Sequence, residues 1–170
     1  RPHKPALILA LMDLVDSGMF PENLIPFSPE LRERFSEYFE IVRSQDDRDT
    51  PWNPYFYLRR EPFWSHLATA GNEAVVAALD SPPSVGKISD LIAGAQLDAD
   101  LWMLLQDDQS RARLRDVLIS RYFPSHLEQL QNLVGPPLRL EEGPTVYDSS
   151  GRSTGFRRIV VQVYEHQCAA

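Results

Sequence analysis

Apolar residues in the first part of the chain recur at helical spacing. From residue 6 to residue 15 they cover almost every face of a helical projection, which predicts a largely buried helix that ends at the Ser17-Gly18 pair. Ser28 followed by Pro29 is typical of a capped helix start, so a second helix is expected there. The apolar stripe of this second helix is Leu31, Phe35, Tyr38, Phe39 and Val42.

The segment 49–64 changes from helical spacing to alternation and is rich in proline and aromatic residues. The alternation predicts a strand, a turn and a strand, with Phe63–Leu67 as the returning strand. One face would show Tyr55, Tyr57 and Arg59, and the other Phe56, Leu58 and Arg60. Tyrosine and arginine together suit a flat ligand with a charged backbone. Composition alone favours the plainer interpretation, a core hairpin with two solvated arginines.

The second half of the chain returns to helical spacing. Asp98 is a good N-cap for one helix, and Asp107 or Asp108 for another that runs to Tyr122. A last helix is expected from Ser125 to Val134. Along the longest of these helices, arginines spaced two residues apart form no single stripe and are expected to face water; they are Arg111, Arg113 and Arg115. A flexible loop is predicted for residues 80–87.

These elements predict an α+β fold: a mainly helical single domain with a small β-hairpin or sheet that carries the binding site. We expect this domain to span residues 1–137. Residues 138–154 are rich in Gly, Pro, Ser and acids and predict a linker. Residues 155–170 predict a basic amphipathic helix that runs into Cys168.

Composition narrows the classes of function. The 170 residues carry a formal net charge of −7, so a nucleic-acid surface would have to be a local basic patch. The chain has one cysteine, Cys168, which excludes a disulfide framework and favours a reducing compartment, the cytoplasm. No apolar run reaches the roughly 20 residues of a membrane span, and no signal peptide is visible. The abrupt ends indicate a piece of a longer protein.

Motifs for catalysis or metal binding are not found. The sequence lacks a nucleophile elbow, a phosphate-binding loop and a dinucleotide fingerprint, so no catalytic residue is predicted. Asp46, Asp47 and Asp49 surround Arg48 and are more typical of a polar loop than of a metal site. His3 and Lys4 are different, because they stand at the start of the first helix, where backbone N–H groups favour an anion.

Several segments of the chain together resemble one family. They are Arg1–Leu14, Asn53–Arg59 with Phe63–Leu67, Leu97–Asp107, Leu118–Phe123 and Val163–Ala170. Over nearly its whole length the chain resembles bacterial HNH-type restriction endonucleases, whose N-terminal domain is a sulfur-binding domain. The resemblance implies a type IV, modification-dependent enzyme that recognises double-stranded DNA with a phosphorothioate backbone. Residues 155–170 would then begin the zinc-bound HNH module.

The resemblance also implies roles for individual residues. The sulfur pocket would be built from Arg1, Pro2, His3, Asn53, Pro54, Tyr55 and Tyr57. Phosphate contacts are expected from Lys4, Arg59, Arg60 and His66, and base-reading loops would include Gln45, Arg48, Ser84 and Lys87. This chain would bind DNA without cofactor or catalysis, whereas its parent would use structural zinc and a divalent metal for cleavage. The resemblance leaves open whether the parent is a homodimer.

Two other functions are compatible with the sequence. One is a reader of another DNA modification such as methylcytosine, in which Trp52, Tyr55 and Trp64 would form an aromatic cage around a flipped base. The other is a protein-interaction domain in which the aromatic segment is simply core.

Overall fold

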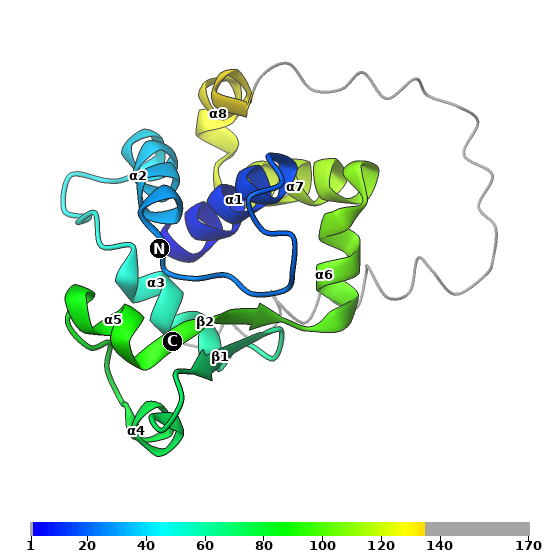
Figure 1. The fold of residues 1–170 in the computed structure, drawn as a ribbon. Helices are drawn as coiled ribbons and strands as arrows, with labels where there is room; N and C mark the ends of the chain where they lie inside the picture. The colour runs from blue at the N-terminus through cyan, green and yellow to red at the C-terminus, as the bar shows by residue number, and fades with distance from the viewer. Residues whose placement is uncertain (1, 135–170) are drawn as a thin grey trace. The chain divides into compact units, whose positions relative to one another are not determined.

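The computed structural model describes residues 2–134, of which Val134 is described by its backbone alone. Figure 1 labels the elements in chain order. They are α1 (His3–Asp16), α2 (Pro29–Val42), α3 (Trp52–Tyr57), η1 (Leu58–Arg60), β1 (Trp64–Ala68), α4 (Glu73–Ala78), α5 (Val85–Leu91), β2 (Ile92–Leu97), α6 (Ala99–Gln106), α7 (Asp108–Tyr122), η2 (Pro124–His126) and α8 (Leu127–Val134). The predicted fold class is confirmed: a mainly helical α+β domain with a small sheet.

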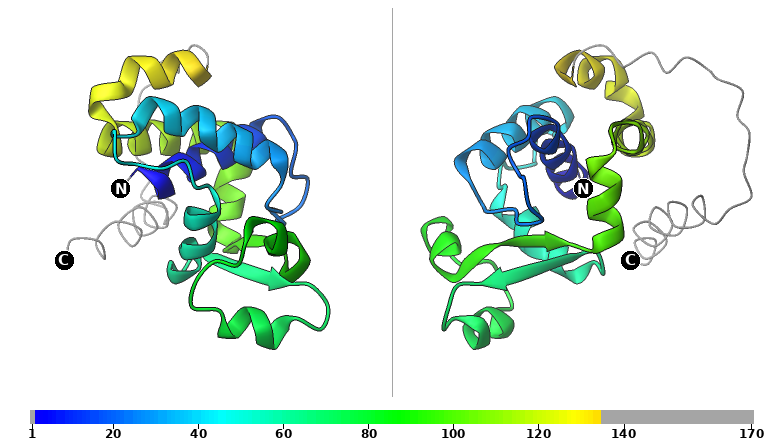
Figure 2. Two further views of the ribbon diagram at one scale, coloured as in Figure 1. Left: turned by 90° about the vertical axis from the view of Figure 1, so that its left-hand side faces the viewer. Right: turned by 45° about the vertical axis from the view of Figure 1, so that its right-hand side comes forward.

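Helix α1 is the centre of the domain. It packs against α2, α3, α6 and α7, as Figures 1 and 2 show, and this explains why its apolar residues cover nearly all its faces. The helix ends at Ser17, and Gly18 follows with φ of 71°, a left-handed conformation that glycine adopts without strain. The sequence predicted the buried helix and its end at the Ser17-Gly18 pair.

The helix starts follow the predicted caps. The Ser28 side chain accepts a hydrogen bond from the Leu31 amide at 3.2 Å, and the five apolar residues predicted for the stripe of α2 are all buried. Asp98 accepts from the Leu101 amide at the start of α6. Asp107 likewise caps α7 by accepting from the Ser110 amide. These local signals therefore predicted where the helices begin.

The sheet consists of β1 and β2, which pair antiparallel from Trp64 opposite Leu97 to Ala68 opposite Ile92. A single bridge from Ile25 to Ala95 adds backbone pairing on β2. The Asn23 side chain continues this contact, because its amide donates to the Leu97 carbonyl and its oxygen accepts from the Leu97 amide. The segment between α1 and α2 is thereby tied to the sheet.

The local hairpin predicted for residues 49–64 is wrong. Residues 52–57 form α3 and residues 58–60 form η1. Pro54 lies in the first turn of α3, where the missing N–H of proline costs little, and Pro51 at the N-cap already has helical dihedral angles. The strand β1 was predicted at 63–67, but its partner is β2, with α4 and α5 between them in the chain.

Two further predictions need correction. Arg111 and Arg115 were expected in water, but both are buried, at 6% and 8% exposed, and only Arg113 of that group is exposed. The segment 80–87, predicted as a loop, already contains the first turn of α5. The predicted linker at 138–154 and the helix at 155–170 lie outside the described residues, as does Arg1.

Candidate nucleic-acid interface

The start of α1 presents backbone amides that no described side chain caps. Pro2 stands at the N-cap, and within the described residues no side chain caps the helix. His3 and Lys4 follow in the first turn, and then Pro5, which has no N–H. The amides of His3 and Lys4 therefore lie at the positive end of the helix dipole, an arrangement that favours an anion.

His3 connects this helix start to the loop that precedes α3. Its Nε2 lies 3.1 Å from the Arg48 carbonyl oxygen, so the ring can donate to it. The ring packs on Phe39 of α2, with centroids 4.5 Å apart. Nδ1 is buried and has no hydrogen-bond partner among the described residues. His3 is thus held in place from α2 and from the loop, and it places residues 44–50 beside the start of α1.

Helix α3 contributes a second set of side chains. Asn53 is half-buried, and its amide donates to the Thr50 hydroxyl at 3.1 Å. Pro54 is buried beneath it. Tyr57 is half-buried at the end of the helix, and the Arg60 guanidinium lies over its ring at 5.0 Å from the centroid. These residues lie on a helix that packs against α1, the helix that begins at His3.

Lys4 reaches from α1 to the turn after η1, where its ammonium pairs with the carboxylate of Glu61. The Lys4 side chain is 28% exposed and that of Glu61 is 13% exposed. The pair therefore lies at the edge of the region, still reachable from solvent. Glu61 was not predicted as a site residue, because nothing in its local sequence indicates that Lys4 would lie beside it.

Tyr55 belongs to the core. It is 0% exposed, its hydroxyl donates to the Ile25 carbonyl at 2.9 Å, and burial raises the pKa of this hydroxyl. Its ring meets Trp64 edge to face, with centroids 5.6 Å apart, and Trp64 is 3% exposed. Neither ring offers a surface to a ligand. The same packing closes the aromatic cage that a methylcytosine reader would need from these residues.

Arg59 and His66 are half-buried and are held by contacts within the domain. The Arg59 guanidinium lies over the Phe56 ring at 4.2 Å and donates to the carbonyls of Val76 and Leu79 at the end of α4. His66 stacks on Tyr55, and its Nε2 lies 3.1 Å from the Tyr55 carbonyl oxygen. Burial lowers the pKa of His66; the Tyr55 carbonyl opposes this shift and the Arg59 charge adds to it. Both side chains therefore contact residues of α3, Arg59 through Phe56 and His66 through Tyr55.

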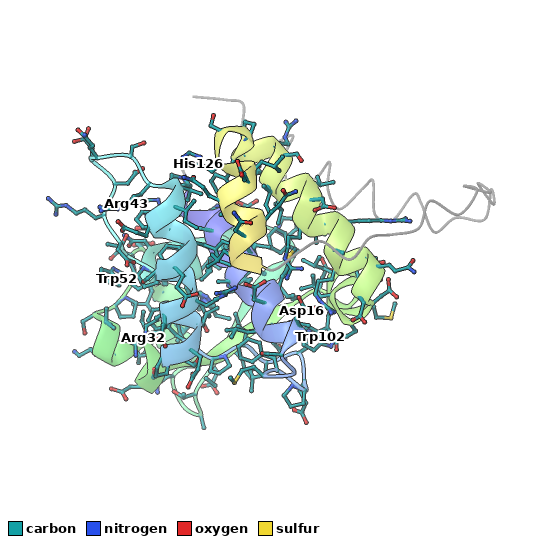
Figure 3. All side chains as sticks on the ribbon, turned by 90° about the horizontal axis from the view of Figure 1, so that it is seen from above. Asp16, Arg32, Arg43, Trp52, Trp102 and His126 are labelled. Atoms are coloured by element: carbon teal, nitrogen blue, oxygen red, sulfur yellow. The ribbon has the colours of Figure 1, made fainter. Side chains whose placement is uncertain are left out.

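The four residues predicted for base-reading loops are exposed. Gln45 and Arg48 lie in the loop between α2 and α3, whereas Ser84 and Lys87 lie at the start of α5. Figures 1 and 2 place the start of α1, α3 and α5 on the same side of this domain. In Figure 3, Trp52 at the start of α3 lies well away from Trp102 on α6, which marks a remote face.

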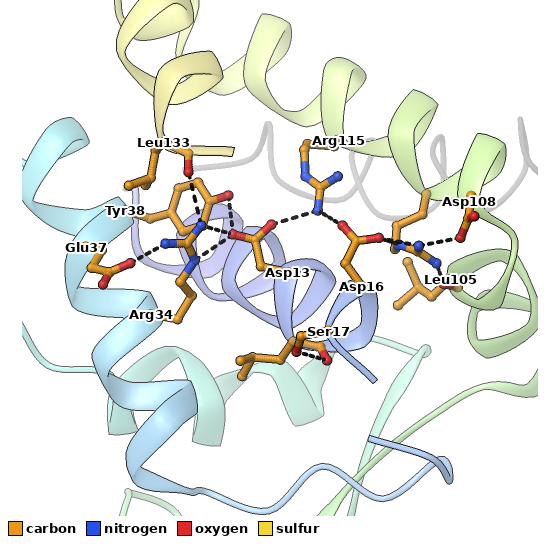
Figure 4. A network of polar contacts seen from close by, with 12 residues as sticks. Asp13, Asp16, Ser17, Arg34, Glu37, Tyr38, Leu105, Asp108, Arg115 and Leu133 are labelled. Carbon is orange, nitrogen blue, oxygen red and sulfur yellow. Dashed lines mark hydrogen bonds and ion pairs between the residues drawn. The ribbon is translucent and has the colours of Figure 1, made fainter. Parts of the chain in front are cut away.

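A second polar cluster was missed in the sequence. Asp13, on α1, accepts hydrogen bonds from Arg34 and Tyr38 of α2 and from Arg115 of α7 (Figure 4). Asp16, one turn further along α1, accepts hydrogen bonds from Arg111 and Arg115 of α7. Burial opposes the charge of Arg115, but Asp16 and Asp13 outweigh it and the pKa of Arg115 is raised. The signal that could have revealed this cluster is the presence of two acids in an otherwise apolar helix, because buried acids need cationic partners.

The comparisons with known proteins add no family. No protein-family model matches the chain, and no curated protein matches it. Within the described residues no group of three or more His, Cys, Asp or Glu side chains is arranged for a metal ion. No helix in this part of the chain is long and apolar enough to cross a bilayer.

Proposed function

We propose that this chain binds double-stranded DNA that carries a backbone phosphorothioate, as the recognition part of a modification-dependent restriction endonuclease. One observation carries the proposal. The two segments that the family resemblance assigns to the sulfur pocket are linked in the structure, because α1 packs against α3 and His3 contacts Arg48 in the loop before α3. Cleavage would belong to the parent protein, in an HNH module with structural zinc and a divalent metal.

The residue types suit a sulfur atom. Sulfur is larger and more polarisable than oxygen and accepts hydrogen bonds poorly, so an apolar wall desolvates it at low cost. Pro2, Asn53 and Tyr57 are half-buried and would line the pocket, with Pro2 and Tyr57 as its apolar wall, and the buried Pro54 would pack behind it. An ordinary phosphate oxygen left there without a donor would cost about 1–3 kcal/mol. Discrimination would therefore come from rejecting oxygen as well as from accepting sulfur.

Charge at the rim would hold the rest of the backbone. Phosphate oxygens would be contacted by the amides at the start of α1, the ammonium of Lys4 and the guanidinium of the exposed Arg60. Gln45, Arg48, Ser84 and Lys87 are exposed and would supply the base contacts. With a net charge of −7, few other cations would add affinity for plain DNA, so the salt dependence should be modest.

The test compares three duplexes of one sequence, with one phosphorothioate, with one methylcytosine, or with neither. Fluorescence anisotropy at two salt concentrations gives the dissociation constants. We expect the phosphorothioate duplex to bind at least tenfold more tightly than the other two. Equal affinity for all three duplexes would contradict the proposal. Preference for methylcytosine would replace it with the alternative reader.

Variants locate the site. Tyr57→Ala should abolish the preference for sulfur, whereas Trp102→Ala, another half-buried aromatic residue, lies on the remote face and should leave it unchanged. Arg60→Ala should weaken binding to modified and plain duplexes alike by several-fold. Arg113→Ala removes the same charge from an exposed position on α7 and serves as its control. Equal effects of a variant and its control would place the interface elsewhere.

A further inference from the structure

The ion pair between Lys4 and Glu61 bears on how tightly the proposed site would bind DNA. The Lys4 ammonium at the start of α1 lies beside the proposed pocket, and it already contacts the Glu61 carboxylate. A DNA phosphate and the Glu61 carboxylate are both anions that would use the same donor. Lys4 is therefore placed between an internal partner and an external one.

The backbone holds Glu61 in position for this competition. The Glu61 amide donates to the Leu58 carbonyl at 2.8 Å, and its carbonyl accepts from the Trp64 amide at 3.2 Å. These bonds fix the turn between η1 and β1. The Glu61 side chain is 13% exposed, so its charge is less screened by solvent than that of a free surface acid. Because it lies next to Lys4, the Glu61 carboxylate would repel any phosphate that approaches the Lys4 ammonium.

We propose that Glu61 is an affinity-limiting residue that holds Lys4 and so weakens binding of the phosphate backbone. This inference rests on the proposed function, because it assigns a role within the same DNA site. A phosphate must displace or share the Glu61 contact, whatever atoms the neighbouring linkage carries. The limit therefore applies equally to plain and modified duplexes, and the preference for sulfur stays with the pocket residues.

The experiment measures Glu61→Gln against the wild type with the phosphorothioate and plain duplexes. We expect both duplexes to bind about five- to tenfold more tightly at low salt. The slope of log affinity against log salt should steepen by about one, because Lys4 becomes free to release one more counterion. Glu128→Gln makes the same charge change at an exposed position on α8, near the top of the domain in Figure 1, and should change neither quantity.

A double variant tests whether the effect passes through Lys4. In the Lys4→Ala background, Glu61→Gln should improve binding by less than twofold, because there is no ammonium left to release. A full gain in that background would overturn the inference, since Glu61 would then act by general repulsion. Unchanged affinity in the single variant would overturn it as well, and the pair would only tie α1 to η1.

The two proposals fail in different ways. The ratio between the duplexes in the wild type tests the proposed function, whereas the change caused by Glu61→Gln tests the role of Glu61. If Glu61→Gln does not fold, the wild type still answers the question through the NMR signal of the Lys4 ε-methylene group. Saturation with the phosphorothioate duplex should shift this signal. An unmoved signal would overturn the role of Lys4 and with it that of Glu61.

Discussion

Two regions of the domain use the same charged residue types in opposite ways. In the helical region, formed by α1, α2, α7 and α8, carboxylates and guanidiniums face each other, and Arg111 and Arg115 are buried. In the sheet region, formed by α3, η1, β1, β2, α4 and α5, Arg60 and Lys87 are exposed. The difference teaches that charge alone did not mark the candidate interface. Arg111 and Arg115 hold helices together, whereas Arg60 and Lys87 are exposed and belong to the proposed interface.

Arg59 and Arg60 show the same contrast in adjacent residues. Arg59 is bound to carbonyls at the end of α4, whereas Arg60 lies over Tyr57 at the surface. A pair of neighbouring arginines therefore splits into one structural residue and one candidate ligand contact.

The largest expected effect is loss of the buried network. Asp13→Ala would remove one carboxylate, which contacts Arg34 at 2.6 Å and Arg115 at 2.7 Å. We expect a loss of about 3–5 kcal/mol in the free energy of unfolding, measured by urea denaturation. Glu40→Ala removes one partner of an exposed pair with Arg43 and should cost under about 1 kcal/mol. Similar losses for both variants would mean that the buried network contributes no more to stability than an exposed ion pair.

The next effect concerns Arg59. Arg59→Ala should cost about 1.5–3 kcal/mol of stability, because two carbonyls at the end of α4 lose a charged donor. Amide hydrogen exchange in α4 should accelerate. Arg60→Ala should leave both stability and exchange nearly unchanged while it weakens DNA binding. If Arg59→Ala weakens DNA binding without a loss of stability, Arg59 would be a phosphate contact, as expected from the sequence.

A smaller effect tests the tie between the sheet and the segment before α2. A methyl group at Gly94 would lie 2.6 Å from Leu24 Cδ1 and 3.2 Å from the Ile25 carbonyl carbon. Gly94→Ala should therefore cost about 1–3 kcal/mol. Gly86→Ala, in the open space around α5, should be neutral or stabilise by up to about 1 kcal/mol. Thermal denaturation should show a lower melting temperature for Gly94→Ala than for the wild type, and an equal or higher one for Gly86→Ala.

The smallest effect is the pH dependence from His66. Burial lowers the pKa of His66 in the folded state. As pH falls through about 6.5, the ordinary histidine pKa, the unfolded chain binds a proton that the folded domain does not, so stability decreases. For one proton, the slope cannot exceed about 1.4 kcal/mol per pH unit. His66→Gln should flatten this part of the stability profile. An unchanged profile would mean that His66 does not titrate in this range.

The sequence by itself determined most helices, and the reason is that their signals are local. Ser28, Asp98 and Asp107 cap helices through side-chain contacts to amides three residues away. The buried stripe of α2 follows from the spacing of its apolar residues alone. Strand β1 was also visible. The candidate site could be predicted as two segments, but not the contacts between them.

Tertiary structure decided the rest, because the deciding contacts join residues far apart in the chain. Alternation in 49–64 was overridden when α3 packed on α1 and β1 found its partner in β2. Arg111 and Arg115 became buried because Asp16 and Asp13 lay opposite them. Lys4 and Glu61 met for the same reason. Local spacing predicts which face of an element is apolar, but only packing determines which distant charge that face will meet.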